Sequence, residues 1–302
     1  MFNTILGETS RKSDFPNQVM SSGHLACPGC GGALALKLAV SILAPDCIFV
    51  IPACCMAVID GPFPYSALGV PLYHTAFPST ASTAAGIAAG LRSQGDHKTV
   101  VVGWAGDGGT FDIGLSAVSA SAARNDDMLY VCYDNEAYMN TGVQQSSATP
   151  PHAWTTTTPV GYPKTRPKKD MLTLMTAHDI PYLATVNPAY PDDFAAKFRT
   201  AKNLSGFRFI HIFSACPPGH KSLEADSVRI SRLAVECRAF PLFEVRTGKL
   251  SLTVEPSRRP VEEYIRLQKR FGHWTQVEME AFQQSVDKRW AALKMLEMTT
   301  HL

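Results

Sequence analysis

The chain has 302 residues, of which 45% are hydrophobic and 18% charged, and its formal net charge is +2. This composition supports a large buried core and excludes an intrinsically disordered chain. The small net charge gives no reason to expect a nucleic acid or an acidic membrane surface as a partner. No run of 18 apolar residues is free of charge or proline, and residues 1–20 lack the pattern of a signal peptide or an anchor. We therefore expect a cytoplasmic protein without membrane insertion.

Helix-like and strand-like segments alternate over residues 31–213. Small or amphipathic stretches predict helices at residues 31–43, 80–93, 112–124, 170–178 and 191–204. Short apolar runs predict strands at residues 47–53, 98–104, 128–133, 182–186 and 207–213. Because these strands are apolar throughout rather than alternating, they are typical of a mostly parallel sheet with helices on both faces. The predicted fold class is α/β.

Two segments depart from this alternation. Residues 140–169 are rich in Ser, Thr, Pro and Lys and have no clear periodicity. A structureless segment of that length in a compact domain is usually functional or contacts a partner. After about residue 240, a predicted hairpin at residues 242–254 precedes mostly charged, amphipathic helix at residues 260–298. We expect residues 1–240 to form the main domain, and residues 241–302 to form a C-terminal hairpin and helical arm that contacts another subunit.

The chain contains eight cysteines and no predicted secretion signal, which argues against a disulfide framework. Some are expected to be buried thiols that pack like small apolar side chains: Cys47, Cys132 and Cys237. Four others indicate an iron–sulfur site: Cys27, Cys30, Cys55 and Cys216. The C-x-x-C pair by itself also fits zinc, although a zinc ribbon normally offers a second such pair and none is present. The same four residues could also be plain thiols, or the pair could be a redox dithiol.

A Gly-Asp-Gly turn at residues 106–108 follows a predicted strand and precedes a predicted helix. Glycines there let the backbone approach phosphate oxygens, and the N–H groups at a helix start attract them. Asp107 makes sense beside a diphosphate if a divalent cation lies between them, since Mg²⁺ prefers carboxylate and phosphate oxygens. A second ligand is expected at the end of the neighbouring strand, where Asn135 follows Asp107 by 28 residues. Taken alone, the turn is also compatible with an ordinary surface turn.

Residues 105–150 closely resemble the β subunit of pyruvate:ferredoxin oxidoreductases, the subunit that binds thiamine diphosphate. The matching stretches are Gly-Asp-Gly-Gly-Thr-Phe-Asp-Ile-Gly from residue 106, Tyr-Asp-Asn-Glu-Ala-Tyr-Met-Asn-Thr-Gly from residue 133, and Ser-Ser-Ala-Thr-Pro from residue 146. Looser matches at residues 27–31, 166–169, 209–211 and 260–264 extend the resemblance over nearly the whole chain. The resemblance implies the thiamine diphosphate-binding fold for residues 1–240.

The resemblance also implies a role for individual residues. The side chains of Asp107 and Asn135 and the carbonyl of Ala137 would bind Mg²⁺. Asn140 would be the catalytic residue, reaching the reacting end of the thiamine beside the substrate, although it could instead only cap the turn. The implied cofactor-binding residues are Gly106, Asp107, Gly108, Asn135, Ala137, Asn140 and Thr141, with Gly142 in the same turn.

The four cysteines Cys27, Cys30, Cys55 and Cys216 are assigned by the same resemblance to one 4Fe–4S cluster. Cys54 precedes Cys55 directly and could be the ligand in its place. Cys55 is preferred because residues 55–59 fit the family pattern better.

Members of this family decarboxylate a 2-oxoacid oxidatively, pass electrons to ferredoxin or flavodoxin, and transfer the acyl group to coenzyme A. The resemblance therefore implies conversion of pyruvate to acetyl-CoA and CO₂. Residues 77–79 and 218–220 depart from the pyruvate-type pattern, which leaves branched-chain, aromatic and oxalate-like 2-oxoacids open.

Two other classes of function would use only part of these residues. A non-redox thiamine diphosphate decarboxylase or transferase would need Asp107 and Asn135 but would have no use for four cluster cysteines. A non-catalytic electron-transfer subunit would need the cysteines but not the metal loop. The presence of both sets in one chain disfavours each of these classes.

The chain lacks two parts that the redox chemistry needs. In related enzymes, the glutamate that activates the thiamine comes from another domain or subunit. Glu136 already lies between two of the implied Mg²⁺ ligands, in residues 134–142, which we call the metal loop. No repeated C-x-x-C-x-x-C motif for further clusters is present. We therefore expect as partners an α subunit that supplies the glutamate, a γ subunit or domain, and a ferredoxin-like subunit or domain.

Overall fold

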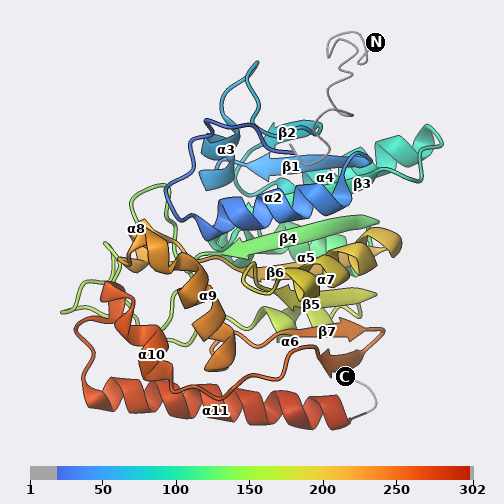
Figure 1. The fold of residues 1–302 in the computed structure, drawn as a ribbon. Helices are drawn as coiled ribbons and strands as arrows, with labels where there is room; N and C mark the ends of the chain where they lie inside the picture. The colour runs from blue at the N-terminus through green and yellow to red at the C-terminus, as the bar shows by residue number, and fades with distance from the viewer. Residues whose placement is uncertain (1–18, 300–302) are drawn as a thin grey trace.

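The computed structural model describes residues 19–299, which form an eight-stranded sheet flanked by helices (Figure 1). The strand order is β2-β1-β3-β4-β6-β5-β7-β8. The first six strands in the chain run parallel to their neighbours, whereas β7 is antiparallel to β5 and β8 is antiparallel to β7. The strands are β1 (Cys47–Pro52), β2 (Leu72–Thr75), β3 (Val100–Gly106), β4 (Met128–Asp134), β5 (Tyr182–Val186), β6 (Phe207–Phe213), β7 (Phe243–Arg246) and β8 (Lys249–Leu252).

Helices cover both faces of the sheet, as the apolar strands predicted. The helices are α2 (Gly31–Leu43), α3 (Cys55–Asp60), α4 (Thr80–Ser93), α5 (Leu115–Ala123), α6 (Met171–Thr176), α7 (Pro191–Asn203), α8 (Pro217–His220), α9 (Ser227–Glu236), α10 (Val261–Arg266) and α11 (Gln276–Met298). A π-helix, η2 (Gly108–Asp112), and two 3₁₀ turns, η3 (Glu224–Asp226) and η4 (Lys269–Phe271), complete the set.

Successive side chains of the central strands enter two different core clusters. In β3, Val102 and Trp104 pack with α2 and α7 on one face, whereas Val101 and Ala105 pack with α4, α5 and α6 on the other. All residues of β3, β4 and β6 are buried. This explains why these strands read as unbroken apolar runs in the sequence.

Several short or edge elements were not predicted. Strand β2 lies at the edge of the sheet and has no buried residue. Helix α9 buries Ile230, Leu233 and Ala234 against α10 in a third core cluster, at the spacing of one helix face. Its sequence mixes these residues with serine and arginine, so the segment did not stand out as a helix.

Residues 243–252 form the predicted hairpin, and they continue the main sheet through the pairing of β7 with β5. Helix α11 begins with a capping box in which Thr275 and Glu278 each bond the backbone of the other. The division of the chain at residue 240 stays a prediction. None of the helices within residues 19–299 is long and apolar enough to cross a membrane.

Parallel strands place their carboxyl ends at one edge of the sheet, on the left in Figure 1. Gly106 at the end of β3 pairs with Tyr133, and Asp134 at the end of β4 pairs with Phe213 at the end of β6. The loops that follow β3, β4 and β6 therefore start side by side, and this edge is where open parallel sheets bind ligands.

Candidate cofactor site

Three oxygen atoms converge where β3 and β4 end. The side-chain oxygen of Asn135 lies 2.9 Å from Oδ1 of Asp107 and 3.0 Å from the carbonyl oxygen of Ala137. None of these oxygens can donate a hydrogen bond to another. Without a cation, the amide is expected to rotate so that its nitrogen donates to both oxygens. With a cation bound, the orientation in which the amide oxygen faces the other two oxygens is favourable.

These oxygen–oxygen distances fit a magnesium ion. In octahedral coordination at about 2.0–2.1 Å, neighbouring ligand oxygens lie about 2.9 Å apart. One carboxylate, one amide oxygen and one carbonyl are also the donor types that Mg²⁺ takes. The residues that the sequence singled out, Asp107, Asn135 and Ala137, therefore lie together in an arrangement that fits the ion.

The glycines of the turn are closely packed. A Cβ atom on Gly108 would lie 2.4 Å from Cε1 of Tyr138, and one on Gly106 would lie 3.2 Å from the Tyr133 ring. Tyr138 donates a hydrogen bond to Asp112 at 3.1 Å and packs edge-on against Phe77. The turn thus depends on glycine at residue 108 for space, because a β-carbon there would overlap the Tyr138 ring.

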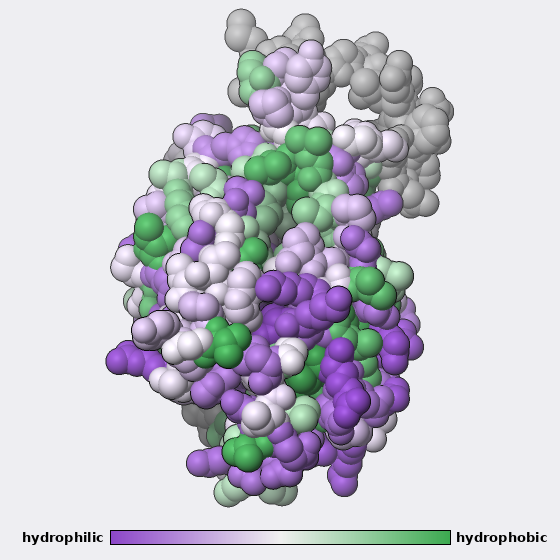
Figure 2. All heavy atoms as spheres, turned by 90° about the vertical axis from the view of Figure 1, so that its left-hand side faces the viewer, coloured by the Kyte–Doolittle hydropathy of each residue, from purple (hydrophilic) through white to green (hydrophobic). Residues whose placement is uncertain are grey.

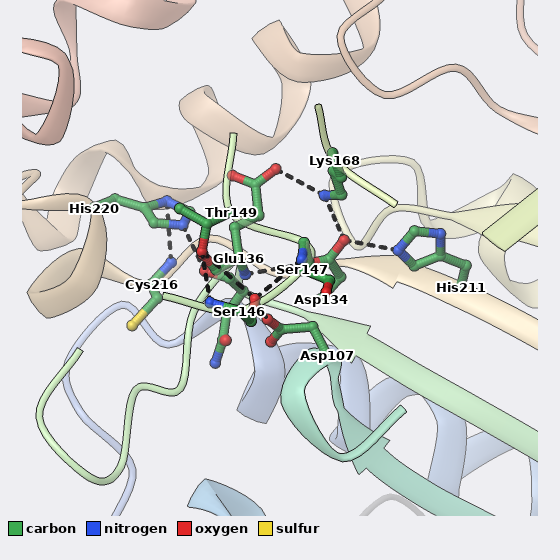
Figure 3. Close-up of polar contacts among 12 residues, drawn as sticks. Asp107, Asp134, Glu136, Ser146, Ser147, Thr149, Lys168, His211, Cys216 and His220 are labelled. Atoms are coloured by element: carbon green, nitrogen blue, oxygen red, sulfur yellow. Dashed lines mark hydrogen bonds and ion pairs between the residues drawn. The ribbon is translucent and has the colours of Figure 1, made fainter. Parts of the chain in front are cut away.

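Buried charges surround the metal loop (Figure 3). Lys168 pairs with Asp134 at 2.5 Å and with Glu136 at 2.9 Å, and His211 contacts Asp134 at 2.8 Å. Arg270, from the C-terminal segment, pairs with Glu136 at 2.5 Å. The buried carboxylates therefore have cationic or hydrogen-bonding partners within the protein.

The pKa values reflect these contacts. Burial and the neighbouring charge of Asp134 raise the pKa of Asp107 well above its ordinary value, against the hydrogen bond that Ser146 donates to it. Burial also acts to raise the pKa of Asp134, but the Lys168 ammonium and the His211 ring outweigh it, so that pKa is lowered. For Glu136, Lys168 and Arg270 likewise overcome burial and lower the pKa. A cation at Asp107 would lower the pKa of that carboxyl in turn.

Asn140 and Thr141 lie at the tip of the loop that follows Ala137. The backbones of Tyr138 and Gln144 bond to each other and close this loop. Both Asn140 and Thr141 are exposed, and Gln144 donates to the Thr141 carbonyl at 2.7 Å. The structure thus brings Asp107, Asn135 and Ala137 together and places Asn140 outside this group, accessible from the surface.

The four predicted cluster cysteines gather at the same edge of the sheet. Burial raises the pKa of Cys55 to about 12, and the charges of Cys54, Cys216, Cys30 and Cys27 contribute to the rise, so each of these four lies near Cys55. Cys30 caps the start of α2 by accepting from the Ala33 N–H at 3.4 Å. Cys216 directly precedes α8, and Cys55 begins α3.

The geometry bears on which metal these cysteines suit and on which of them would bind it. Within residues 19–299, no three Cys, His, Asp or Glu side chains lie close enough together to hold one metal ion. A 4Fe–4S cluster binds each thiolate to a different iron and so needs a wider spacing. Cys54 is buried and hydrogen-bonded to Tyr133, whereas Cys55 is partly exposed; the choice of Cys55 as the ligand stays a prediction.

His220 connects the two groups of residues and was not predicted to belong to the site. Its Nε2 donates to the carbonyl of Asn135 at 3.0 Å, and its Nδ1 accepts from the N–H of Cys216 at 3.5 Å (Figure 3). Burial and the charge of Arg270 lower the pKa of His220 to about 3, so the ring is neutral. Lys168 lies in a stretch that matched the family, but nothing in the sequence indicated its contact with the metal loop, and no signal pointed to Arg270.

Known proteins resemble this chain over most of its length. Residues 62–212 match the model of the thiamine pyrophosphate enzyme, C-terminal TPP binding domain. The ketoisovalerate oxidoreductase subunit VorB of Pyrococcus horikoshii is 46% identical over 91% of this chain and 92% of its own. The pyruvate synthase subunit PorB of Methanothermobacter thermautotrophicus is 42% identical over 89% of this chain and 95% of its own.

A solved structure shares the fold. The 2-oxoglutarate:ferredoxin oxidoreductase from Magnetococcus marinus matches with a TM-score of 0.57 and 24% identity, over 72% of this chain and 80% of that chain. The fold class and the family that the sequence predicted are both confirmed. The chain belongs to the β subunits of thiamine diphosphate-dependent 2-oxoacid:ferredoxin oxidoreductases.

Proposed function

We propose that this subunit holds Mg²⁺, thiamine diphosphate and one 4Fe–4S cluster, and that its complex converts pyruvate to acetyl-CoA and CO₂ with ferredoxin as electron acceptor. The observation that carries the proposal is the convergence of the Asp107 carboxylate, the Asn135 side-chain amide and the Ala137 carbonyl within 2.9–3.0 Å. When bound, thiamine diphosphate supplies the carbon nucleophile and the electron sink for decarboxylation, and the cluster accepts the electrons.

The residues of this chain bind and orient these groups. Asp107, Asn135 and the Ala137 carbonyl would hold the magnesium ion that neutralises the diphosphate. Gly106 and Gly108 leave room for the backbone to approach it. Asn140, on the exposed loop tip, would hold the carboxylate or carbonyl of the substrate, and its amide does not compete as a base.

The contacts of Glu136 support the need for a partner subunit. Its carboxylate is buried and paired with both Lys168 and Arg270, so it is not free to activate the thiamine pyrimidine. An α subunit supplying a glutamate therefore completes the site. The chain exposes large apolar side chains that suit a subunit contact, among them Phe63, Tyr65 and Tyr162, and Figure 2 shows apolar groups among polar ones on the face where the strands end. A γ subunit or domain and a ferredoxin-like subunit or domain would relay electrons to ferredoxin or flavodoxin.

Two 2-oxoacids compete as the substrate. The names of the relatives point to ketoisovalerate at 46% identity and to pyruvate at 42%. Phe77 lies against Tyr138 beside the metal loop, and His220 lies between that loop and Cys216. Both departures from the pyruvate-type pattern thus lie in or beside the site, which favours ketoisovalerate as the second candidate.

The test is to purify the complex anaerobically with its co-expressed partners and to assay iron, sulfide, magnesium and thiamine diphosphate. One thiamine diphosphate per β subunit is expected, together with about four irons, which one 4Fe–4S cluster holds, beyond the iron of the ferredoxin-like subunit or domain. Cys216→Ser should lose the irons bound by this chain. Cys237→Ser, which alters a buried thiol in a separate part of the hydrophobic core, should keep them. Reduction of ferredoxin with pyruvate and with ketoisovalerate then identifies the substrate.

Thiamine diphosphate without iron on this chain would refute the cluster assignment and leave a thiamine enzyme whose electrons go elsewhere. Iron without thiamine diphosphate would refute the magnesium site. A complex active on neither 2-oxoacid would refute the substrate proposal alone.

A further inference from the structure

Glu136 has an unusual backbone conformation at the centre of the metal loop. Its φ is +68°, in the left-handed region that residues other than glycine seldom adopt. It lies between Asn135 and Ala137, whose oxygens approach each other to 3.0 Å. The side chain that precedes this left-handed residue and the carbonyl that follows it thus face the same place. Such a conformation persists only where the surroundings hold it.

Two cations hold the Glu136 side chain, and both come from segments later in the chain. Lys168, at the end of the long irregular segment, places Nζ 2.9 Å from Oε1 and also 2.5 Å from Oδ2 of Asp134. Arg270, in η4 of the C-terminal segment, places Nη2 2.5 Å from Oε2. Arg270 is fixed in turn by Gln268, whose Oε1 accepts from its Nε at 3.0 Å and from its Nη2 at 2.7 Å.

The contact between Arg270 and Glu136 is well shielded from water, whereas the Lys168 side chain is 21% exposed. Arg270 is 2% exposed and Glu136 6% exposed. Charge pairs in such surroundings are screened little by salt, and removing one partner leaves a buried charge unpaired. The backbone of the turn is held as well, since Asp134 accepts from the Glu136 N–H at 3.0 Å and Thr149 donates to the Glu136 carbonyl at 2.7 Å.

We propose that Lys168 and Arg270 are positioning residues that clamp Glu136 in its left-handed conformation and so hold the oxygens of Asn135 and Ala137 ready for Mg²⁺. This rests on the magnesium part of the proposed function. It gives the C-terminal segment a part in cofactor binding, because Arg270 reaches the metal loop from there. Neither residue would itself hold the ion.

The test compares Mg²⁺ affinity, at a fixed concentration of thiamine diphosphate, in the anaerobically purified complex and its variants. Arg270→Met removes the charge but keeps much of the volume, and it should weaken Mg²⁺ binding about 10- to 100-fold, as for other residues that orient a metal ligand. Arg270→Lys should recover part of that loss. Amide hydrogen exchange at residues 134–142 should rise in Arg270→Met and fall back in Arg270→Lys.

A matched control separates this role from plain stability. Lys197→Met removes a buried cation away from the metal loop. Lys197 pairs with Asp193 at 2.8 Å and donates a hydrogen bond to the Thr185 carbonyl. It should lower the stability of the complex and leave Mg²⁺ affinity within about twofold, a change of under about 0.4 kcal/mol. If Arg270→Met does not fold, Glu136→Gln, which keeps the shape of the side chain, replaces it.

The outcomes decide the proposal. The double variant Glu136→Gln with Arg270→Met should bind Mg²⁺ no more weakly than the single Glu136→Gln, because loss of the Glu136 charge already breaks its ion pair with Arg270. Wild-type Mg²⁺ affinity and exchange in Arg270→Met would overturn the clamp, and so would equal losses of affinity in Arg270→Met and Lys197→Met. A wild-type complex that binds no Mg²⁺ with thiamine diphosphate would instead refute the magnesium site.

Discussion

Gly108→Ala tests whether the Gly-Asp-Gly turn is shaped for close approach. The new Cβ would lie 2.4, 2.6 and 2.8 Å from Cε1, Cδ1 and Cζ of Tyr138. Carbon atoms in contact prefer about 3.5–4.0 Å, so the ring would have to retreat by about 1 Å. Tyr138 is held by Asp112 and Phe77, and overpacking of this kind costs about 1–3 kcal/mol.

The retreat of Tyr138 should also disturb magnesium binding, because its neighbour Ala137 supplies one of the three oxygens. We expect urea unfolding to show the loss of about 1–3 kcal/mol, and titration to show weaker binding of Mg²⁺ with thiamine diphosphate. Gly90→Ala is the control: Gly90 lies within α4 with no atom within 4 Å of the added Cβ, so this change should stabilise by up to about 1 kcal/mol. Unchanged stability and unchanged cofactor affinity in Gly108→Ala would refute the reasoning.

Three further changes have defined outcomes. Asp107→Ala removes the only carboxylate of the oxygen trio and should abolish magnesium-dependent thiamine diphosphate binding, measured by calorimetry; retained binding would exclude this site. After removal of any iron–sulfur cluster, iodoacetamide at about pH 8 should alkylate Cys27 long before Cys55. Cys27 is exposed, whereas burial raises the pKa of Cys55 to about 12. Mass spectrometry of the two peptides checks the order, and equal alkylation rates would contradict it. Burial lowers the pKa of His220 to about 3, whereas an unfolded histidine titrates near about 6.5. Between pH 6.5 and pH 3, roughly, only the unfolded chain binds this proton, so the stability of the protein should fall as the pH drops through that range. His220→Gln should lack this component of the pH dependence, and an unchanged profile would count against it.

The sequence by itself determined most of the elements and the chemical types of the site residues. Strands such as β3 and β4 are continuous apolar runs, and the Gly-Asp-Gly turn directly follows one of them, so short contiguous patterns were enough to predict them. The order of Asp107 and Asn135 along two neighbouring strands then predicted their meeting at one edge of the sheet, because parallel strands end together.

Only the tertiary structure decided what holds that site in place. Arg270 pairs with a residue 134 positions earlier, and His220 bonds a carbonyl 85 positions earlier. Such contacts depend on the strand order β3-β4-β6 and on the path of the C-terminal segment, neither of which leaves a periodic trace in the chain. The left-handed turn at Glu136 is equally invisible in sequence, since glutamate has no preference for it and its conformation is imposed by side chains that folding brings from elsewhere.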